Sequence, residues 1–275
     1  MKKESLFDLS GKAIVVTGAC GLLGRNHCQA IAEAGGNPIV LDLNEKDAVS
    51  FARELSDEFS VRSSGYSVDI TVEQEIHENA LSVRSEFGEI DGLVNNAANN
   101  PKMENRSEKN FERLENFPLD AWEQDIAVGL TGAFLCSKHY GQMIERNPRG
   151  GVIINISSDL ALIAPDQRLY RESGLSSDQQ PVKPITYSVI KSGLLGLTRY
   201  LATYWPEKVR CNAICPGGVE ASQPKEFLDK VSQTIPLGRL AQPNEYKGSL
   251  VYLLSEASSY LNGSIISVDG GRTCW

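Results

Sequence analysis

A tyrosine and a lysine four residues apart, Tyr187 and Lys191 in "ITYSVIKSG" (185–193), have the types and spacing that most directly suggest chemistry. On a helix they would project from the same face, where an ammonium group can favour the ionised form of a phenol. Apolar residues follow at the 4, 3, 4 spacing of a buried helical stripe: Ile190, Leu194, Leu197 and Leu201. The pattern predicts a helix that is anchored beside the core and carries the pair.

A second tyrosine and lysine have the same spacing, Tyr204 and Lys208 in "YWPEK". Pro206 lies between them and should end or kink the helix. Because a short motif arises easily by chance, the place of each pair in a larger pattern must decide between them.

A glycine-rich turn offers a second kind of chemistry. In "TGACGLLGRNHCQ", Gly18, Gly21 and Gly24 lie between a β-branched run and a helical pattern. Glycine lets the backbone approach a pyrophosphate, and a helix N-terminus supplies free N–H groups. Asp42 ends the next apolar run, 24 residues after Gly18, where a carboxylate can bind ribose hydroxyls. This context predicts a dinucleotide site; close packing of helix on strand without a ligand is the alternative.

The residues around Asp42 also bear on which dinucleotide binds. A carboxylate repels a 2′-phosphate, and Leu43 and Asn44 supply no compensating cation, so NAD is favoured over NADP. Arg25 is a nearby cation that keeps NADP open.

Seven short β-branched or apolar runs alternate with helical stretches and must position these residues. They are residues 13–16, 38–41, 66–68, 92–94, 152–156, 210–214 and 264–268. Such alternation predicts an α/β fold, a doubly wound, Rossmann-like parallel sheet of about seven strands with helices on both faces. We expect a single dinucleotide-binding catalytic domain over 1–275, because no linker divides the chain.

Two polar segments interrupt the regular alternation, near 99–116 and 163–184. Each follows the carboxyl end of a predicted strand, the edge at which open α/β sheets bind ligands. We interpret them as rim insertions that form pocket walls; for the first, a merely solvated surface loop is an equal alternative.

Composition excludes several classes of function. The chain has 27 Lys plus Arg against 35 Asp plus Glu and no basic cluster, so nucleic acid is not an expected partner. Neither an 18-residue apolar stretch nor a secretory signal is found, so we expect a cytoplasmic protein with no membrane partner. Six cysteines without CxxC pairs and three histidines without ligand spacing indicate reduced thiols and no metal.

Several short motifs occur in a fixed order along the chain: the glycine turn, then "NNAA" (95–98), "NISS" (155–158), "YSVIK" (187–191), "CPGG" (215–218) and "VDGG" (268–271). Together they resemble the short-chain dehydrogenase/reductase family, in its compact single-domain branch, from about Gly11 to Gly271. The resemblance selects Tyr187 over Tyr204, because Tyr187 follows the serine strand. It also implies a homodimer or homotetramer.

The resemblance further implies roles for individual residues. Tyr187 would be the general acid/base, Lys191 would bind the nicotinamide ribose and lower the pKa of the tyrosine, and Ser158 would hydrogen-bond the reacting oxygen. The implied cofactor-binding set is Gly18, Gly21, Leu23, Gly24, Asp42, Asp69, Ile70, Asn96, Ala97, Tyr187, Lys191, Pro216 and Val219.

Four features depart from the family pattern. The glycine spacing is GxxGxxG, with Leu22 where the compact branch usually has glycine. Gly129 replaces an asparagine of the proton relay, and Ala221 replaces a cofactor-contacting threonine. Ser158 and Tyr187 are 29 residues apart, against about a dozen in the usual motif, so we expect the insert to lie over the substrate.

We therefore expect an NAD-dependent oxidoreductase that interconverts a secondary alcohol and a ketone. The insert has a formal charge of zero and many polar groups, which suits a polyhydroxylated, sugar-like small molecule. "APDQRLY", "VGLTGAF" and "GGRTCW" also resemble oxidoreductases of flagellin and surface-glycan sugar pathways. The alternatives are a sugar-nucleotide epimerase or dehydratase, suggested by the glycine spacing, and a cofactor-binding regulator without turnover, suggested by Gly129 and Ala221.

Overall fold

The seven apolar runs form seven strands in a computed structural model that describes residues 5–99 and 112–275. The strands are β1 (Ala13–Thr17), β2 (Asn37–Asp42), β3 (Ser64–Ser67), β4 (Gly92–Asn95), β5 (Gly151–Ile156), β6 (Val209–Pro216) and β7 (Ile265–Val268). All pair in parallel in one sheet, in the order β3-β2-β1-β4-β5-β6-β7. The order reverses between β1 and β4, the switch point at which such sheets bind ligands. The predicted doubly wound Rossmann-like domain is confirmed.

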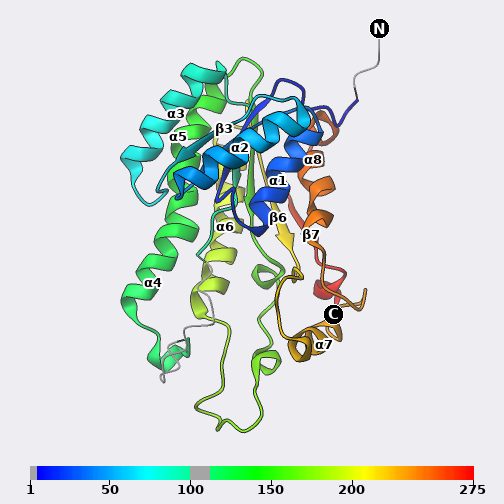
Figure 1. Ribbon diagram of the computed structural model, residues 1–275. Helices are drawn as coiled ribbons and strands as arrows, with labels where there is room; N and C mark the ends of the chain where they lie inside the picture. The colour runs from blue at the N-terminus through cyan, green and yellow to red at the C-terminus, as the bar shows by residue number, and fades with distance from the viewer. Residues whose placement is uncertain (1–4, 100–111) are drawn as a thin grey trace.

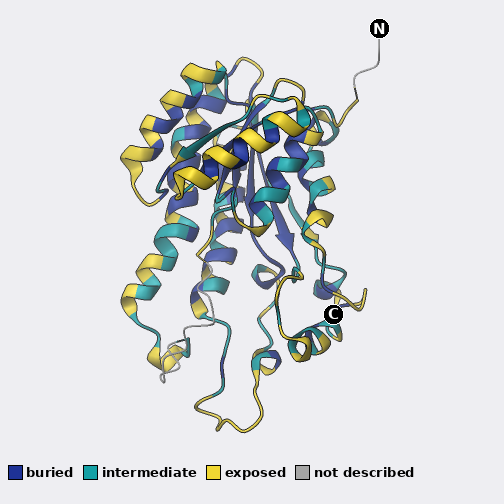
Figure 2. Cartoon of the chain, viewed as in Figure 1, coloured by how far each residue is buried: buried dark blue, intermediate teal, exposed yellow. Residues whose placement is uncertain are grey.

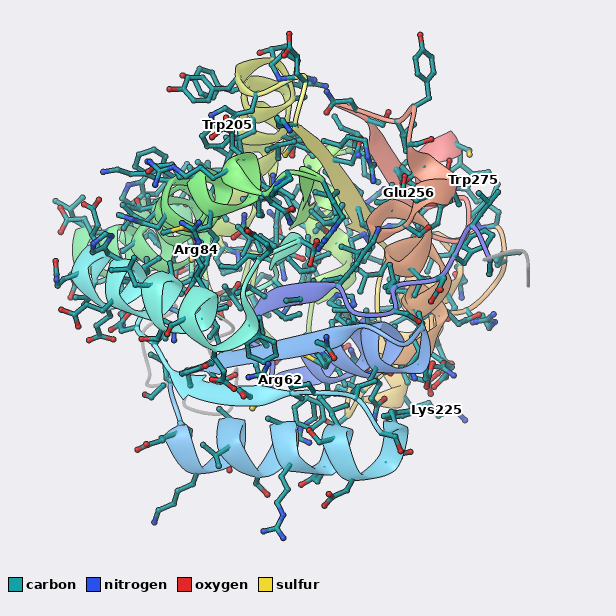
Figure 3. The ribbon with its side chains drawn as sticks, turned by 90° about the horizontal axis from the view of Figure 1, so that it is seen from above. Arg62, Arg84, Trp205, Lys225, Glu256 and Trp275 are labelled. Atoms are coloured by element: carbon teal, nitrogen blue, oxygen red, sulfur yellow. The ribbon has the colours of Figure 1, made fainter. Side chains whose placement is uncertain are left out.

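Helices cover both faces of this sheet (Figure 1). Those of the described residues are α1 (Leu22–Glu33), α2 (Glu45–Phe59), α3 (Glu73–Phe87), α4 (Leu119–Ile126), α5 (Gly132–Arg146), α6 (Ile185–Tyr204), α7 (Lys225–Ser232) and α8 (Lys247–Leu254). Buried side chains of α1, α2 and α8 form one core layer, and those of α3, α5 and α6 form the other. Seen from above, the helices flank the sheet on its two sides (Figure 3). None of the helices in the described ranges has the length and apolar character needed to cross a bilayer.

The central strands are mainly apolar because both of their faces are buried, whereas the edge strands β3 and β7 are only partly buried (Figure 2). In β1, Ile14 and Val16 contribute to the layer with α1, whereas Ala13 and Val15 contribute to the layer with α6. Asn155, a polar residue inside β5, is paired by side-chain hydrogen bonds, and further polar residues follow the strands at the carboxyl edge of the sheet.

Helix α6 carries the predicted tyrosine and lysine on a buried stripe. Ile190, Leu194 and Leu201 are buried and Leu197 is half-buried against the same core, as the spacing predicts. The helix ends at Tyr204, before Pro206, and the Lys208 ammonium instead donates to the carbonyl of Pro148 at 3.0 Å. Tyr204 and Lys208 therefore do not share a helical face.

The second predicted insertion extends beyond the carboxyl edge of the sheet, next to α7 (Figure 1). Leu169, in its short 3₁₀ helix Gln167–Tyr170, is buried in a small cluster with Val231, Ile235 and Leu240. Arg113 Nη1 donates to the Ser177 carbonyl at 3.0 Å, which ties the segment before α4 to the insert. Of the first predicted insertion, residues 100–111 lie outside the described part of the chain.

Candidate active site

Two positions of the glycine turn after β1, Gly18 and Gly24, have no room for a side chain. Gly18 has a φ of +59°, and a Cβ there would lie 2.8 Å from the Ala97 Cα. A Cβ on Gly24 would lie 2.2 Å from the Gly18 carbonyl oxygen. The turn leads directly into α1, whose first-turn N–H groups, including that of Leu23, have no preceding turn to bond. Backbone approach and helix N-terminus together fit a pyrophosphate.

Asp42 ends β2 beside this turn and is held by two backbone donors. Its Oδ2 accepts from the Cys20 N–H and its Oδ1 from the Leu43 N–H, both at 2.9 Å. Arg25 lies beside the same turn: its Nε donates to the Cys20 carbonyl at 3.3 Å, and its guanidinium lies 4.4 Å from the Phe51 ring centroid and 3.8 Å from a Glu54 oxygen. The carboxylate is thus presented at the nucleotide edge, and Arg25 is a cation close to that edge.

The other predicted cofactor residues lie along the same edge. Asn96 and Ala97 follow β4, Pro216 ends β6, and Val219 forms a β-bridge with Ala241 just beyond. The Asn96 side chain donates at 3.0 Å to the carbonyls of Thr17 and Gly18, so two hydrogen bonds from this amide hold the backbone of the glycine turn in place.

Asp69 and Ile70 follow β3 at this edge and lie near Asp42, because the Val68 N–H donates to the Asp42 carbonyl at 3.0 Å. The Asp69 carboxylate accepts from the backbone and hydroxyl of Thr71, at 2.8 and 2.7 Å. Ile70 is buried and packs against Gly132. Glycine turn, helix N-terminus and ribose-side carboxylate are therefore joined on one continuous edge that fits a dinucleotide.

Ser158, Tyr187 and Lys191 are brought together at the end of β5, despite the long insert between them. Ser158 is buried and lies close enough to Tyr187 to lower the pKa of the phenol. The buried Lys191 ammonium donates to the Ile156 carbonyl at 2.9 Å and lies 5.9 Å from the Tyr187 ring centroid. Ser157 donates to the Lys191 carbonyl at 2.7 Å, which fixes α6 against the strand end. Ser157 thus has a structural contact and Ser158 faces the tyrosine.

Comparisons with known proteins match nearly the whole chain. The sequence profile of the family described as enoyl-(acyl carrier protein) reductase matches residues 18–273. The NADP-dependent mannitol dehydrogenase of Hypocrea jecorina is 31% identical over 276 residues, which cover 98% of this chain and 94% of that protein. The chain belongs to the short-chain dehydrogenase/reductase family.

Two further relatives agree with this assignment. D-threitol dehydrogenase of Mycolicibacterium smegmatis is 30% identical, over 97% of this chain and 95% of that protein. The crystal structure of a gluconate 5-dehydrogenase from Burkholderia cenocepacia in complex with NADP and tartrate superposes with a TM-score of 0.82, at 26% identity and over 98% of both chains. This short-chain dehydrogenase/reductase is therefore a nicotinamide-dependent oxidoreductase that interconverts an alcohol and a ketone.

Burial sets the proton affinities in the site of this family member. It raises the pKa of Tyr187, and the hydrogen bond with Ser158 opposes that effect. It lowers the pKa of Lys191 to about 8, with a further contribution from the positive charge of Lys183. A buried phenol therefore needs nearby positive charge before it ionises near neutral pH. The phenolate formed in this way is the species that can accept a proton.

A buried ion pair next to the serine was not anticipated from the sequence. Asp159 accepts from the Ser158 hydroxyl at 2.9 Å, from the Leu160 N–H at 2.8 Å and from Arg272 Nη1 at 2.9 Å. The Arg272 and Asp159 side chains are only 10% and 3% exposed. Their separation of 113 residues leaves no local pattern that could have revealed the pair. The available signal was a carboxylate directly after "NISS" and directly before the apolar run 160–164.

The replacement of the relay asparagine by Gly129 has a packing reason. Gly129 lies in one π-helical turn, Ala127–Thr131, between α4 and α5. A Cβ at this position would lie 2.7 Å from Ile190 Cγ2 on α6, so Ile190 occupies the space that a side chain would need. In this short-chain dehydrogenase/reductase, glycine at 129 and isoleucine at 190 are therefore complementary.

Proposed function

We propose that this protein is an NAD-preferring dehydrogenase/reductase that interconverts a secondary alcohol and a ketone on a polyhydroxylated substrate. The observation that carries the proposal is the contact of Ser158 with Tyr187 above a buried Lys191, on the edge that holds the glycine turn. Such a set of a phenol, a hydroxyl and a cation provides proton transfer to and from a reacting oxygen.

In the oxidation direction, Tyr187 would remove the proton of the substrate hydroxyl through its phenolic oxygen. Ser158 would hydrogen-bond the same oxygen and hold it against Tyr187. Lys191 would favour the phenolate: a free phenol titrates near pH ~10, so work near neutrality requires a pKa lower by about 2 to 3 units, or roughly 3 to 4 kcal/mol. When bound on the glycine-turn edge, NAD would take up the hydride lost from the alcohol carbon in this direction, and NADH would return it in the reverse direction.

The polarity of the rim supports a sugar-like substrate. A cavity of about 320 Å³ lies beside Lys183 and is lined by residues of 112–115 and of the insert, among them Gln167. The insert contributes the Gln167 amide and the Lys183 ammonium group to this lining, and residues 112–115 contribute charged side chains, so several hydrogen-bonding groups line the cavity. The mannitol and threitol dehydrogenases named above act, by name, on sugar alcohols, which is the substrate class that we propose here.

An assay for reduced nicotinamide tests the proposal. With NAD and a panel of sugar alcohols, sugars and their phosphates, we expect turnover on one polyhydroxylated class and none on apolar secondary alcohols of similar size. Measurable NADH binding without turnover on any member of the panel would instead support the cofactor-binding regulator.

The cofactor preference rests on Asp42. Changing Asp42→Ser removes a carboxylate that would repel a 2′-phosphate, so we expect the ratio of kcat/KM for NAD to that for NADP to fall by about 10- to 100-fold. The measurement is steady-state kinetics with both cofactors at one substrate concentration. Asp57→Asn, which removes an exposed carboxylate farther along the next helix, is the matched control and should leave the ratio unchanged. A wild type that already prefers NADP would contradict the proposal.

We also propose a cytoplasmic homodimer or homotetramer, in line with the family. Phe134 on α5 is 49% exposed and Tyr200 on α6 is 61% exposed, which suits burial against a second copy. Sedimentation velocity at micromolar concentration tests this; a species of 30.0 kDa alone would contradict it.

A further inference from the structure

A second lysine lies over the aromatic ring of Tyr187, the proposed general acid/base. Lys183 Nζ is 3.8 Å from the centroid of the Tyr187 ring, closer than Lys191 Nζ at 5.9 Å. Lys183 precedes α6 and comes from the insert, where its backbone N–H donates to Gln167 Oε1 at 2.8 Å. The long insert therefore delivers a cation to the face of the phenol, which Lys191 does not approach as closely.

The ammonium group of Lys183 forms no ion pair in the described part of the chain. Over residues 5–99 and 112–275, its ammonium group has neither a hydrogen-bond acceptor nor a carboxylate at ion-pair distance, whereas Arg168 of the same insert is paired with Asp166. Burial lowers the pKa of Lys183, while Glu112 and Asp159 act on it in the opposite sense. A half-buried ammonium group that lies over an aromatic ring is stabilised most when that ring carries negative charge.

We propose that Lys183 is a positioning residue for proton transfer, whose ammonium group lies over the Tyr187 ring and favours the phenolate. This inference rests on the proposed role of Tyr187 as the general acid/base. Negative charge of a phenolate spreads into the ring, so a cation over the ring face stabilises it more than it stabilises the neutral phenol. Lys183 and Lys191 then act on the same ring from the insert and from α6.

Several other groups face this ring from the elements packed around it, and they set the background against which Lys183 acts. They are Ser158 and Asp159 after β5, Tyr170 of the insert, Lys191 of α6, Cys215 of β6, Tyr246 and Arg272. Of these, Asp159 raises and Arg272 lowers the pKa of Tyr187, and the two are paired with each other, so their opposed charges form a background that is the same in wild type and in Lys183 variants.

The test is a direct titration of Tyr187, independent of turnover. Protein labelled with ¹³C at the tyrosine Cζ carbons gives signals from nine tyrosines, and the Tyr187 signal is the one lost in Tyr187→Phe. The titration is followed with and without saturating NAD. In Lys183→Gln we expect the midpoint of Tyr187 to rise by about one pH unit, and in Lys183→Arg, which keeps the charge, to stay within about 0.3 unit of wild type.

Arg168→Gln removes an exposed, paired cation of the same insert and is the matched control, with an unchanged midpoint expected. Should Lys183→Gln not fold, Lys183→Met keeps the methylene stem on the ring and gives the same comparison. Equal midpoints in wild type and Lys183→Gln would overturn the inference. So would a wild-type Tyr187 that does not titrate while the protein stays folded. A shifted midpoint without turnover on any substrate would leave the inference standing and count against the proposed function alone.

Discussion

Replacement of Tyr187 with phenylalanine is expected to lower kcat and kcat/KM together by about 10²- to 10⁴-fold. The variant keeps the ring on which Lys183 lies and removes only the hydroxyl whose pKa is affected by Ser158. Since that hydroxyl exchanges the proton in the proposed reaction, its loss should affect the chemical step and leave NADH binding within about twofold. Steady-state kinetics and NADH fluorescence titration on the same preparation measure both quantities.

Tyr204→Phe is the matched control, because Tyr204 ends the same helix, is 57% exposed and lies away from Ser158. It should retain wild-type kcat. If Tyr187→Phe keeps more than a tenth of the wild-type kcat, another group must transfer the proton and the proposed role of Tyr187 is wrong.

The second large effect is expected from Arg272→Ala, which should lower the free energy of unfolding by about 3 to 5 kcal/mol. The substitution leaves the Asp159 carboxylate, only 3% exposed, without its buried countercharge. Urea unfolding followed by fluorescence measures the change. Because Asp159 also accepts the Ser158 hydroxyl, we expect kcat to fall as well under conditions in which the variant remains folded.

Two comparisons separate the charge effect from simple loss of a side chain. Arg168→Ala breaks an exposed ion pair with Asp166 and should cost less than about 1 kcal/mol. The double variant Arg272→Met/Asp159→Asn removes both charges and should recover most of the lost stability. A cost below about 1 kcal/mol for Arg272→Ala would mean that water reaches Asp159 and that the pair is not effectively buried.

The fold could be predicted from the sequence because its signals are local. Most of the strands are mainly apolar runs, and residues such as Ile14 and Val15 are both buried although they point to opposite faces. The end of α6 before Pro206 followed from the missing N–H of proline. The order of the motifs then placed Ser158 and Tyr187 in one site across the insert.

The electrostatics of the site could not be predicted in the same way, because they depend on contacts between distant segments. Nothing near Arg272 in the sequence indicates Asp159 as its partner. Lys183 was one of six charged residues in the insert, and only the start of α6 at Ile185 decides that it lies over the Tyr187 ring. The exclusion of a side chain at Gly129 likewise depends on Ile190 of another helix.

The pairing of Asp159 with Arg272 also affects the order in which parts of the site form during synthesis and folding. During synthesis, chains emerge from the N-terminus and their parts can begin to fold before the rest is made. The glycine turn, Ser158, Tyr187 and Lys191 all leave the ribosome well before Arg272, which lies beyond the last strand, β7. Until Arg272 docks, Asp159 is a carboxylate without its countercharge beside the reactive serine. The nucleotide edge can therefore form early, whereas the proton-transfer site reaches its final electrostatic state among the last events of folding.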